Sequence, residues 1–211
     1  MGITPVRSLL VEALIGQSSD ADATDTAILA ATIRCLSHHG LERTTVADVA
    51  TEAGVGRATV FRRFDTKEEL LTRAFAWELD QLVARFHSVI DSIGNPYERA
   101  VEWIVEAVRT VRNHPVARRF VDDGVAISVL HDPQITTLLL TSVRHELDLT
   151  AQRTGVEFDT ATAAEIVSRF FVSVWLAPDL GSATADDEGV RRMARTMLSF
   201  LVVPSPSPTD V

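Results

Sequence analysis

The sequence contains one cysteine and one lysine, and it has no run of about 18 consecutive apolar residues. The single cysteine, Cys35, excludes an intramolecular disulfide framework, and no segment is apolar for long enough to be expected to cross a membrane. The short apolar stretch at residues 9–15 follows only one base, Arg7, so we expect no secretory signal. These absences predict a cytoplasmic protein with no membrane partner.

Catalytic and metal-binding patterns are also missing. The sequence has no G-x-S-x-G nucleophile motif, no H-E-x-x-H zinc motif and no phosphate-binding P-loop. Gly54-Val55-Gly56 follows a helical pattern rather than a strand, which argues against a dinucleotide-binding loop. The six histidines form no H-x-x-x-H pair and no cluster with cysteine. We therefore expect a protein that is not an enzyme, with no metal and no cofactor.

The charge of the chain is unevenly distributed. A net charge of −9 argues at first against a nucleic-acid partner. Residues 76–211 carry twelve bases and nineteen acids, however, whereas residues 21–75 carry seven bases and eight acids. Within the latter segment, residues 54–64 hold three arginines and no acid: Arg57, Arg62 and Arg63. A local basic face on a nearly neutral segment suits sequence-selective DNA binding.

Apolar residues recur at helical spacing along most of the chain, and strand-like alternation is scarce. The pattern predicts an all-α fold. A first helix at residues 25–39 ends at Gly40, and a short helix runs from Thr44 or Thr45 to Ala53. A turn containing Gly54 separates that short helix from a second one at about residues 57–64. Two short helices joined by a glycine-containing turn, after a first helix, form a helix-turn-helix.

Helix-start signals divide the remainder of the chain. Thr66 and Glu69 form a capping box, and Asn95-Pro96 and Asp132-Pro133 each place a capping residue before a proline. The expected helices cover residues 70–91, 96–113, 116–122, 133–154, 160–175 and 189–203. The expected domains are an N-terminal extension (1–20), a helix-turn-helix DNA-binding domain (21–65), a helical body (66–203) and a disordered tail (204–211).

The stretch DTAILAATIRCLSHHGLERTTVADVATEAGVGRATVFRRFDTKEELL, from Asp25 to Leu71, resembles the tetracycline-repressor (TetR) family of bacterial regulators. It covers roughly a quarter of the chain, and several separate features agree in order and spacing. The resemblance implies a cytoplasmic, ligand-responsive transcriptional regulator, most often a repressor, that binds double-stranded operator DNA. It also implies a C-terminal helical body that binds a small-molecule effector. That body would form a homodimer through the last two long helices, at residues 160–175 and 189–203.

The second short helix must enter the major groove and present its first residues to base edges. Small residues permit close approach, and an arginine can make two hydrogen bonds to guanine. By position in the family motif, Thr45 would bind phosphate at the start of the first short helix. Arg57, Ala58 and Thr59 would face base edges.

Four further residues of the motif are assigned to DNA binding. Phe61 replaces the family's usual tyrosine and lacks the hydroxyl that commonly contacts phosphate. Arg63 stands where histidine is frequent, and its charge could replace that contact. Arg62 belongs to the same basic group, although successive helical positions point in different directions. Lys67 would lie near the DNA backbone at the start of the next long helix.

Large apolar side chains in the C-terminal body predict a largely apolar pocket between the helices at residues 70–91, 96–113 and 133–154. Trp103 lies off the apolar stripe of its own helix, and Phe120 follows a bend at Pro115, so we expect one of them to touch the ligand. His145 or Arg109 would supply a polar anchor. The expected effector is a small apolar or aromatic molecule.

Two other functions compete with this interpretation. The first alternative is a helical enzyme or binding protein that acts on an apolar small molecule, which the missing catalytic motifs disfavour. The second is a protein-binding regulator without DNA affinity, which the basic second helix disfavours. The sequence identifies neither the effector nor the operator.

Overall fold

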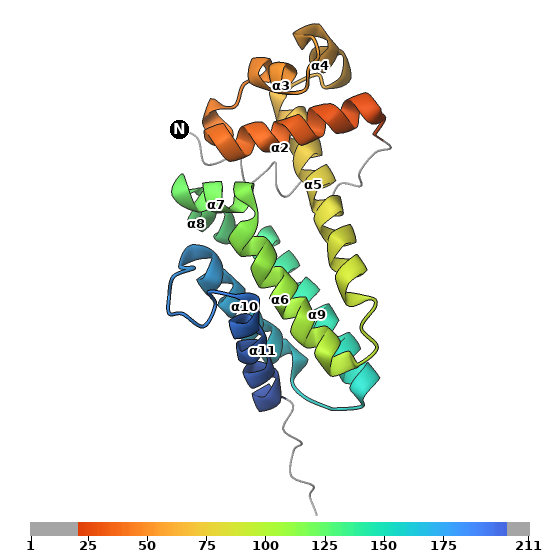
Figure 1. The fold of residues 1–211 in the computed structure, drawn as a ribbon, viewed down its shortest axis with the longest axis vertical. Helices are drawn as coiled ribbons and strands as arrows, with labels where there is room; N and C mark the ends of the chain where they lie inside the picture. Colours follow the sequence, from red (N-terminus) through yellow and green to blue (C-terminus); the bar gives the residue numbers. More distant parts are fainter. Residues whose placement is uncertain (1–20, 202–211) are drawn as a thin grey trace, which may run out of the picture. The chain divides into compact units, whose positions relative to one another are not determined.

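The computed structural model describes residues 21–201, and every regular element within that range is an α-helix (Figure 1). The all-α prediction is therefore confirmed for the described residues. The expected N-terminal extension (1–20) and the expected tail (204–211) lie outside them. Among the described helices, none combines the length and the apolarity that crossing a bilayer requires.

The three helices expected at the start of the chain are present. They are α2 (Ala23–Arg43), α3 (Val46–Glu52) and α4 (Arg57–Arg63). The carboxylate of Asp22 caps α2 by accepting a hydrogen bond from the backbone N–H of Thr24 at 2.8 Å. Gly40 interrupts α2 with a φ of 75°, a left-handed conformation that favours glycine. A Cβ at this position would also meet the end of the Asp123 side chain, which can move aside, so the backbone conformation is the main requirement for glycine.

Seven helices follow, and most begin at the capping signals seen in the sequence. They are α5 (Lys67–Ile90), α6 (Pro96–Asn113), α7 (Pro115–Asp122), α8 (Val125–Leu130), α9 (Pro133–Thr154), α10 (Thr160–Leu176) and α11 (Asp187–Leu201). The hydroxyl of Thr66 accepts from the backbone N–H of Glu69 at 3.0 Å, and the side chain of Asn95 accepts from that of Glu98 at 3.0 Å. Only α8 was not expected, because it is short and begins after a left-handed turn at Gly124.

The chain forms two compact units, each with a core of its own. Among the described residues, the first comprises 21–85 and Pro115–Ile135, and the second comprises Phe86–His114 and 136–201. The described core of the first unit is made by α2, α3, α4 and the start of α5. Its buried members include Ile28, Leu29, Val49, Val60, Phe64 and Leu70.

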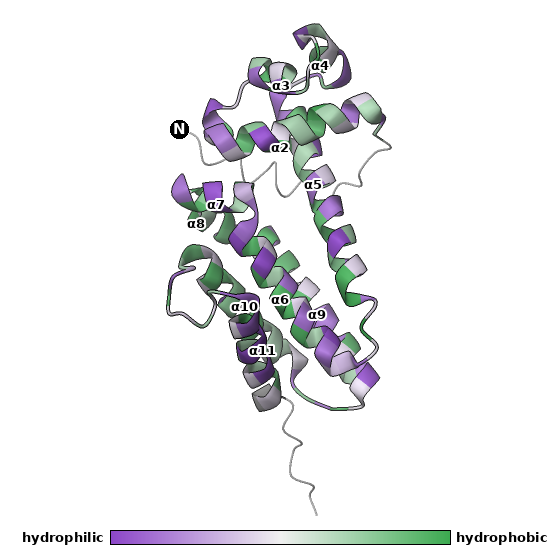
Figure 2. Ribbon diagram, viewed as in Figure 1, coloured by the Kyte–Doolittle hydropathy of each residue, from purple (hydrophilic) through white to green (hydrophobic). Residues whose placement is uncertain are grey.

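The core of the second unit is made by α6, α9, α10 and α11. Its buried members include Val101, Ile104, Val105, Val108, Leu147, Val167, Phe171 and Leu198. Helix α11 contributes one apolar stripe to this core, and Figure 2 shows hydrophilic residues on the side of it that faces the viewer. Packing of amphipathic faces therefore accounts for the stability of each unit separately.

The compact units divide the chain differently from the expected domains. Helices α7 and α8 belong with the helix-turn-helix helices, because α7 packs on α2 and its Phe120 contacts Phe75 edge to face at 6.1 Å between ring centres. The expected boundary between residues 65 and 66 is a functional division and stays a prediction.

Candidate nucleic-acid interface

Helix α4 presents an exposed face made of four residues at helical spacing: Arg57, Ala58, Phe61 and Arg62. The opposite face of α4 is anchored in the core by Val60, and Phe64 is buried immediately after the helix, with each side chain 1% exposed. The guanidinium of Arg73 lies 4.6 Å from the centre of the Phe64 ring, a cation–π contact. The core therefore fixes the rotation of α4 about its axis, and this fixes which four residues face outward.

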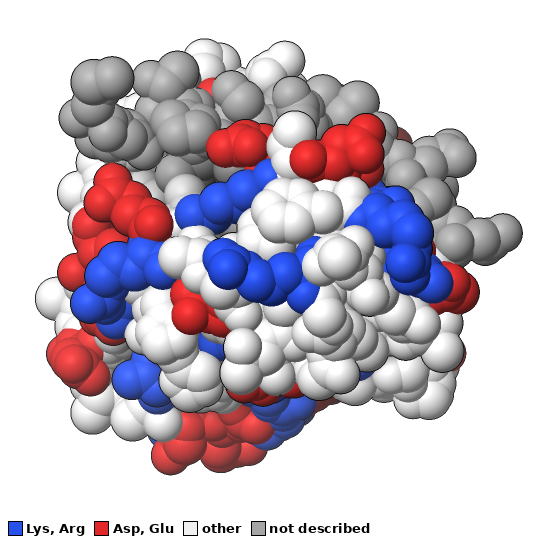
Figure 3. All heavy atoms as spheres, turned by 90° about the horizontal axis from the view of Figure 1, so that it is seen from above, with Lys and Arg blue, Asp and Glu red and all other residues white. Residues whose placement is uncertain are grey.

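The outward face of α4 is basic and lacks a bulky N-cap. Gly56 precedes the helix and makes no side-chain hydrogen bond to it. Arg57 and Arg62 form no ion pair with any residue that the structure describes, so both charges are available to a partner. Figure 3, which looks down on this end of the chain, shows Lys and Arg side chains across the middle of the face and most Asp and Glu nearer its margins. Thr59 is half-buried.

Thr45, expected to bind phosphate, caps α3. Its hydroxyl donates to the Asp48 carboxylate at 2.6 Å, and it accepts from the backbone N–H of Asp48 at 3.2 Å. These hydrogen bonds to Thr45 hold the pKa of the Asp48 carboxyl below its usual value. Thr44, the other candidate cap, is buried and donates to the carbonyl of Gly40. Thr45 thus positions α3, and its contact with phosphate stays a prediction.

Arg63 differs from the other arginines of α4 because acidic residues hold it. Its Nη1 atom lies 2.6 Å from a carboxylate oxygen of Asp22 and 2.6 Å from one of Asp25. Arg73 lies 3.5 Å from the second oxygen of Asp25. The end of α4 is therefore tied to the first turn of α2, which favours a positioning role for Arg63 over a contact with DNA. Lys67, at the start of α5, donates to the carbonyl of Leu41 at 3.4 Å.

The network around Arg63 gives a prediction that separates positioning from DNA contact. The hydrogen bond from Arg63 holds the pKa of Asp22 below its usual value. Such a carboxylate stabilises the fold above its unfolded pKa, and this contribution is lost as the pH falls through the lower folded pKa. We expect Arg63→Gln to lower the melting temperature at pH 7 without DNA and to flatten its decline on acidification.

The control is Arg118→Gln, because Arg118 is an exposed arginine of the same unit with no ion pair among the described residues. Arg118→Gln should leave the melting temperature unchanged, as should Arg57→Ala. Equal melting temperatures for Arg63→Gln and the native chain at pH 7 would show that the network does not position α4.

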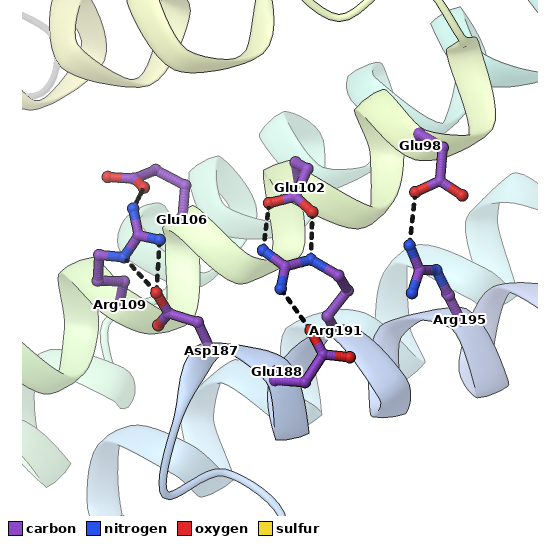
Figure 4. A network of polar contacts seen from close by, with 8 residues as sticks. All are labelled: Glu98, Glu102, Glu106, Arg109, Asp187, Glu188, Arg191 and Arg195. Atoms are coloured by element: carbon purple, nitrogen blue, oxygen red, sulfur yellow. Dashed lines mark hydrogen bonds and ion pairs between the residues drawn. The ribbon is translucent and has the colours of Figure 1, made fainter.

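Arg109, expected as a polar anchor for a ligand, belongs to a series of ion pairs between α6 and α11 (Figure 4). It contacts Glu106 on its own helix and Asp187 of α11, the latter at 2.6 Å. Further along, Arg191 binds Glu102, and Arg195 lies 2.9 Å from Glu98. The three partners on α11 are spaced four residues apart and lie on one face of that helix, so the pairs fix the register of α11 against α6.

The central pair, Glu102 with Arg191, gives a second prediction. Hydrogen bonding to Arg191 holds the pKa of Glu102 below its usual value of 4.5. The pair therefore stabilises the fold above about pH 4.5, and the contribution is lost as the pH falls through the lower folded pKa. We expect Glu102→Gln to lower the free energy of unfolding by about 1 kcal/mol at pH 7, and by less at pH 3. Urea denaturation at both pH values measures this, and an equal loss at both would contradict it.

The structure does not bring the four expected ligand residues together. Trp103 lines a cavity of about 10 Å³ with Ala100, Ile104, Val143, Glu146, Leu147 and Val167. Phe120 is buried in the first unit, and His145 is exposed on α9. The cavity is bounded by α6, α9 and α10, whereas the sequence suggested α5, α6 and α9. Its volume is about that of one water molecule, so a ligand needs the helices or side chains to move.

Sequence reasoning missed the partners of Arg63. Asp22 and Asp25 lie in a first turn, where acids are common because they complement the helix dipole. Because the helix dipole explains both acids locally, the sequence does not indicate their hydrogen bonds to Arg63, about forty positions later. An arginine in place of the motif's usual histidine was the available signal, but its charge was assigned to DNA.

The first unit thus has three short-range features together: a buried first helix, a glycine turn, and a second short helix with an exposed basic face. They define a helix-turn-helix protein. Residues 28–74 match the family model described as "Bacterial regulatory proteins, tetR family". The chain therefore carries an N-terminal domain similar to that of the TetR family of bacterial regulators.

Relatives with curated names share mainly this domain. The chain is 32% identical over 78 residues to the HTH-type transcriptional repressor KstR2 of Mycobacterium tuberculosis, a match that covers 37% of this chain and 39% of KstR2. The match thus spans about two fifths of the length of that relative.

Solved structures resemble the larger part of the chain. A TetR transcription regulator from Haloarcula marismortui superposes with a TM-score of 0.65 at 20% identity, covering 85% of this chain and 98% of that one. The transcriptional regulator FadR from Bacillus subtilis, in complex with stearoyl-CoA, superposes with a TM-score of 0.57 at 18% identity over 85% of this chain and 98% of FadR. At these identities the likeness concerns the fold alone.

Proposed function

We propose that the protein is a ligand-responsive DNA-binding transcriptional regulator, most simply a repressor that a small molecule releases from its operator. The observation that carries this proposal is the face of α4, where two arginines with no ion pair among the described residues, a small residue and an exposed aromatic ring project from a helix fixed by its core. Such a face matches the width and the donor–acceptor pattern of the major groove. Arg57, at the start of the helix, is placed to bind guanine.

The regulator would act as a twofold homodimer. An operator with two half-sites needs two recognition helices about 34 Å apart, which a dimer supplies. Helix α10 leaves Ile166 39% exposed, and an exposed apolar side chain of this kind suits an interface. The dimer interface should exceed about 1,000 Å².

An effector would act by changing the spacing of the two recognition helices. A ligand shifts an equilibrium between conformations only when it binds one of them more tightly. The apolar cavity beside Trp103 favours the second unit as the binding site of the effector, and the similarly folded FadR of Bacillus subtilis is described in complex with stearoyl-CoA. An apolar or aromatic compound would have to enlarge this cavity in order to bind.

Gel shifts of the full chain with the intergenic DNA upstream of its own gene test the proposal. We expect a discrete complex that resists excess unrelated DNA and dissociates on addition of the effector. A helical enzyme acting on an apolar molecule, or a regulator that binds only proteins, would give no discrete complex. That result would remove the DNA-binding function.

A further inference from the structure

Two hollows lie along the same pair of helices in the second unit. The small apolar cavity is lined by α6 and α9, with Val167 of α10 closing it. An open pocket of about 340 Å³ is lined by Asp91, Ile93, Gly94, Pro96, Arg99 and Arg153. Arg99 of α6 precedes Trp103 by one helical turn, and Arg153 follows Leu147 along α9. The same two helices thus carry an apolar hollow at one level and a basic pocket near their ends.

The open pocket carries a surplus positive charge although the chain as a whole is acidic. Arg99 and Arg153 line it with one acid, Asp91, whose carboxylate lies 2.7 Å from Nη1 of Arg99. Arg153 is exposed and has no ion-pair partner among residues 21–201. Arg153 therefore leaves one positive charge uncompensated, in a chain whose net charge is −9. One negative charge on a ligand would balance the pocket.

Arg99 also has an unused hydrogen-bond donor. Its side chain is 12% exposed, and its Nη1 donates to the carbonyl of Ile90 at 3.0 Å. Its Nε atom is buried and has no hydrogen-bond partner in the described part of the chain. A buried donor left without a partner costs free energy, and a ligand acceptor would remove that cost once the Arg99 side chain turns its Nε toward the pocket.

The apolar cavity sets the orientation of such a ligand. Glu146 is the one acidic residue in its wall, and a second carboxylate beside it would be repelled. Its other lining side chains are apolar, and Trp103 packs against the rings of Phe86 and Phe171 at 6.0 and 5.6 Å between centres. An apolar group can displace the Trp103 ring and keep contact with the same surfaces. The charged group of the ligand then lies beside Arg99 and Arg153.

We propose that the pocket at Arg99 and Arg153 binds the anionic end group, a carboxylate or a phosphate, of a small amphipathic molecule. Its apolar part enters between α6 and α9 beside Trp103. The inference rests on the proposed function only in treating this molecule as the effector. Binding of this molecule needs no DNA, so the ligand site and the proposed DNA-binding function can be tested separately.

Isothermal titration of the full chain with octanoate, octyl phosphate and octanol tests the site. The three probes share one apolar chain and differ in the end group. At least one of the two anions should bind about 10-fold more tightly than octanol, and the tighter anion identifies the end group. Arg153→Gln should reduce the affinity for that anion to the octanol level and leave octanol binding unchanged. Arg118→Gln, an exposed arginine in the other unit, should change neither affinity.

Three results would overturn the site. The first is equal binding of octanol and both anions, and the second is unchanged anion binding by Arg153→Gln. The third is that acetate binds as tightly as octanoate, or inorganic phosphate as tightly as octyl phosphate. Either result would show that the apolar cavity contributes nothing to binding. None of these results affects the DNA-binding proposal, which the gel shift tests separately.

Discussion

Arg57→Ala is expected to weaken operator binding by about 1–3 kcal/mol and to relax the preference for the operator over other sequences. The physical reason is the loss of a paired hydrogen bond to a base edge, which carries sequence information. Arg57 is exposed at the first position of α4 and forms no ion pair among the described residues, so the substitution removes no contact that stabilises the fold. Fluorescence anisotropy with operator and scrambled duplexes measures both affinities.

Lys67→Ala is the matched comparison for Arg57→Ala. Lys67 starts α5, and a phosphate contact there would weaken binding to all sequences about equally and reduce the salt slope by about 1. Arg118→Ala should alter neither affinity nor slope. Unchanged affinity and unchanged preference in Arg57→Ala would rule out base recognition by this residue.

Ile166→Glu is expected to raise the dissociation constant of the homodimer at least about 100-fold, which corresponds to about 2.7 kcal/mol. Twofold symmetry places the new carboxylate in the interface twice, where each charge loses water without gaining a partner. Ile166 is 39% exposed on α10, so the monomer fold can tolerate the change. Sedimentation velocity across a range of concentrations gives the dissociation constant, and operator affinity should fall in parallel.

Ile127→Glu is the control for assembly, because Ile127 is 55% exposed on α8, away from α10 and α11 in the sequence. It should leave the dimer intact. Phe171 is unsuitable for this test because it is 5% exposed in the core of its own unit, and a charge there would unfold the chain. A native dissociation constant for Ile166→Glu would exclude α10 from the interface.

Helix starts could be predicted from the sequence because their signals are local. Thr66 and Asn95 cap the helices that follow them, and Gly40 and Gly54 take the left-handed conformations that turns require. Of the α4 residues that the motif assigned to DNA, Arg57, Ala58, Phe61 and Arg62 are exposed and Thr59 and Arg63 are half-buried, and their contacts with DNA stay predictions. Helix α8 was missed, because six residues are too few to show a helical period.

Features that depend on contacts between distant residues could not be predicted. An arginine at position 63 of a helix-turn-helix motif is typical of a DNA-binding residue. Its ion pairs with Asp22 and Asp25 form only when the chain folds. Arg109 was likewise predicted to anchor a ligand, but in the fold its guanidinium forms an ion pair with Asp187 of α11. The cavity at Trp103 depends on the fit of three helices, which periodicity does not determine.

The central claim is that α4 reads a DNA sequence, and the ratio of two affinities tests it most directly. The full chain is titrated, at physiological salt, against its upstream intergenic DNA and against a scrambled duplex of equal length and composition. We expect the upstream DNA to bind at least about 1,000-fold more tightly than the scrambled duplex. Equal affinities for the two duplexes would contradict it.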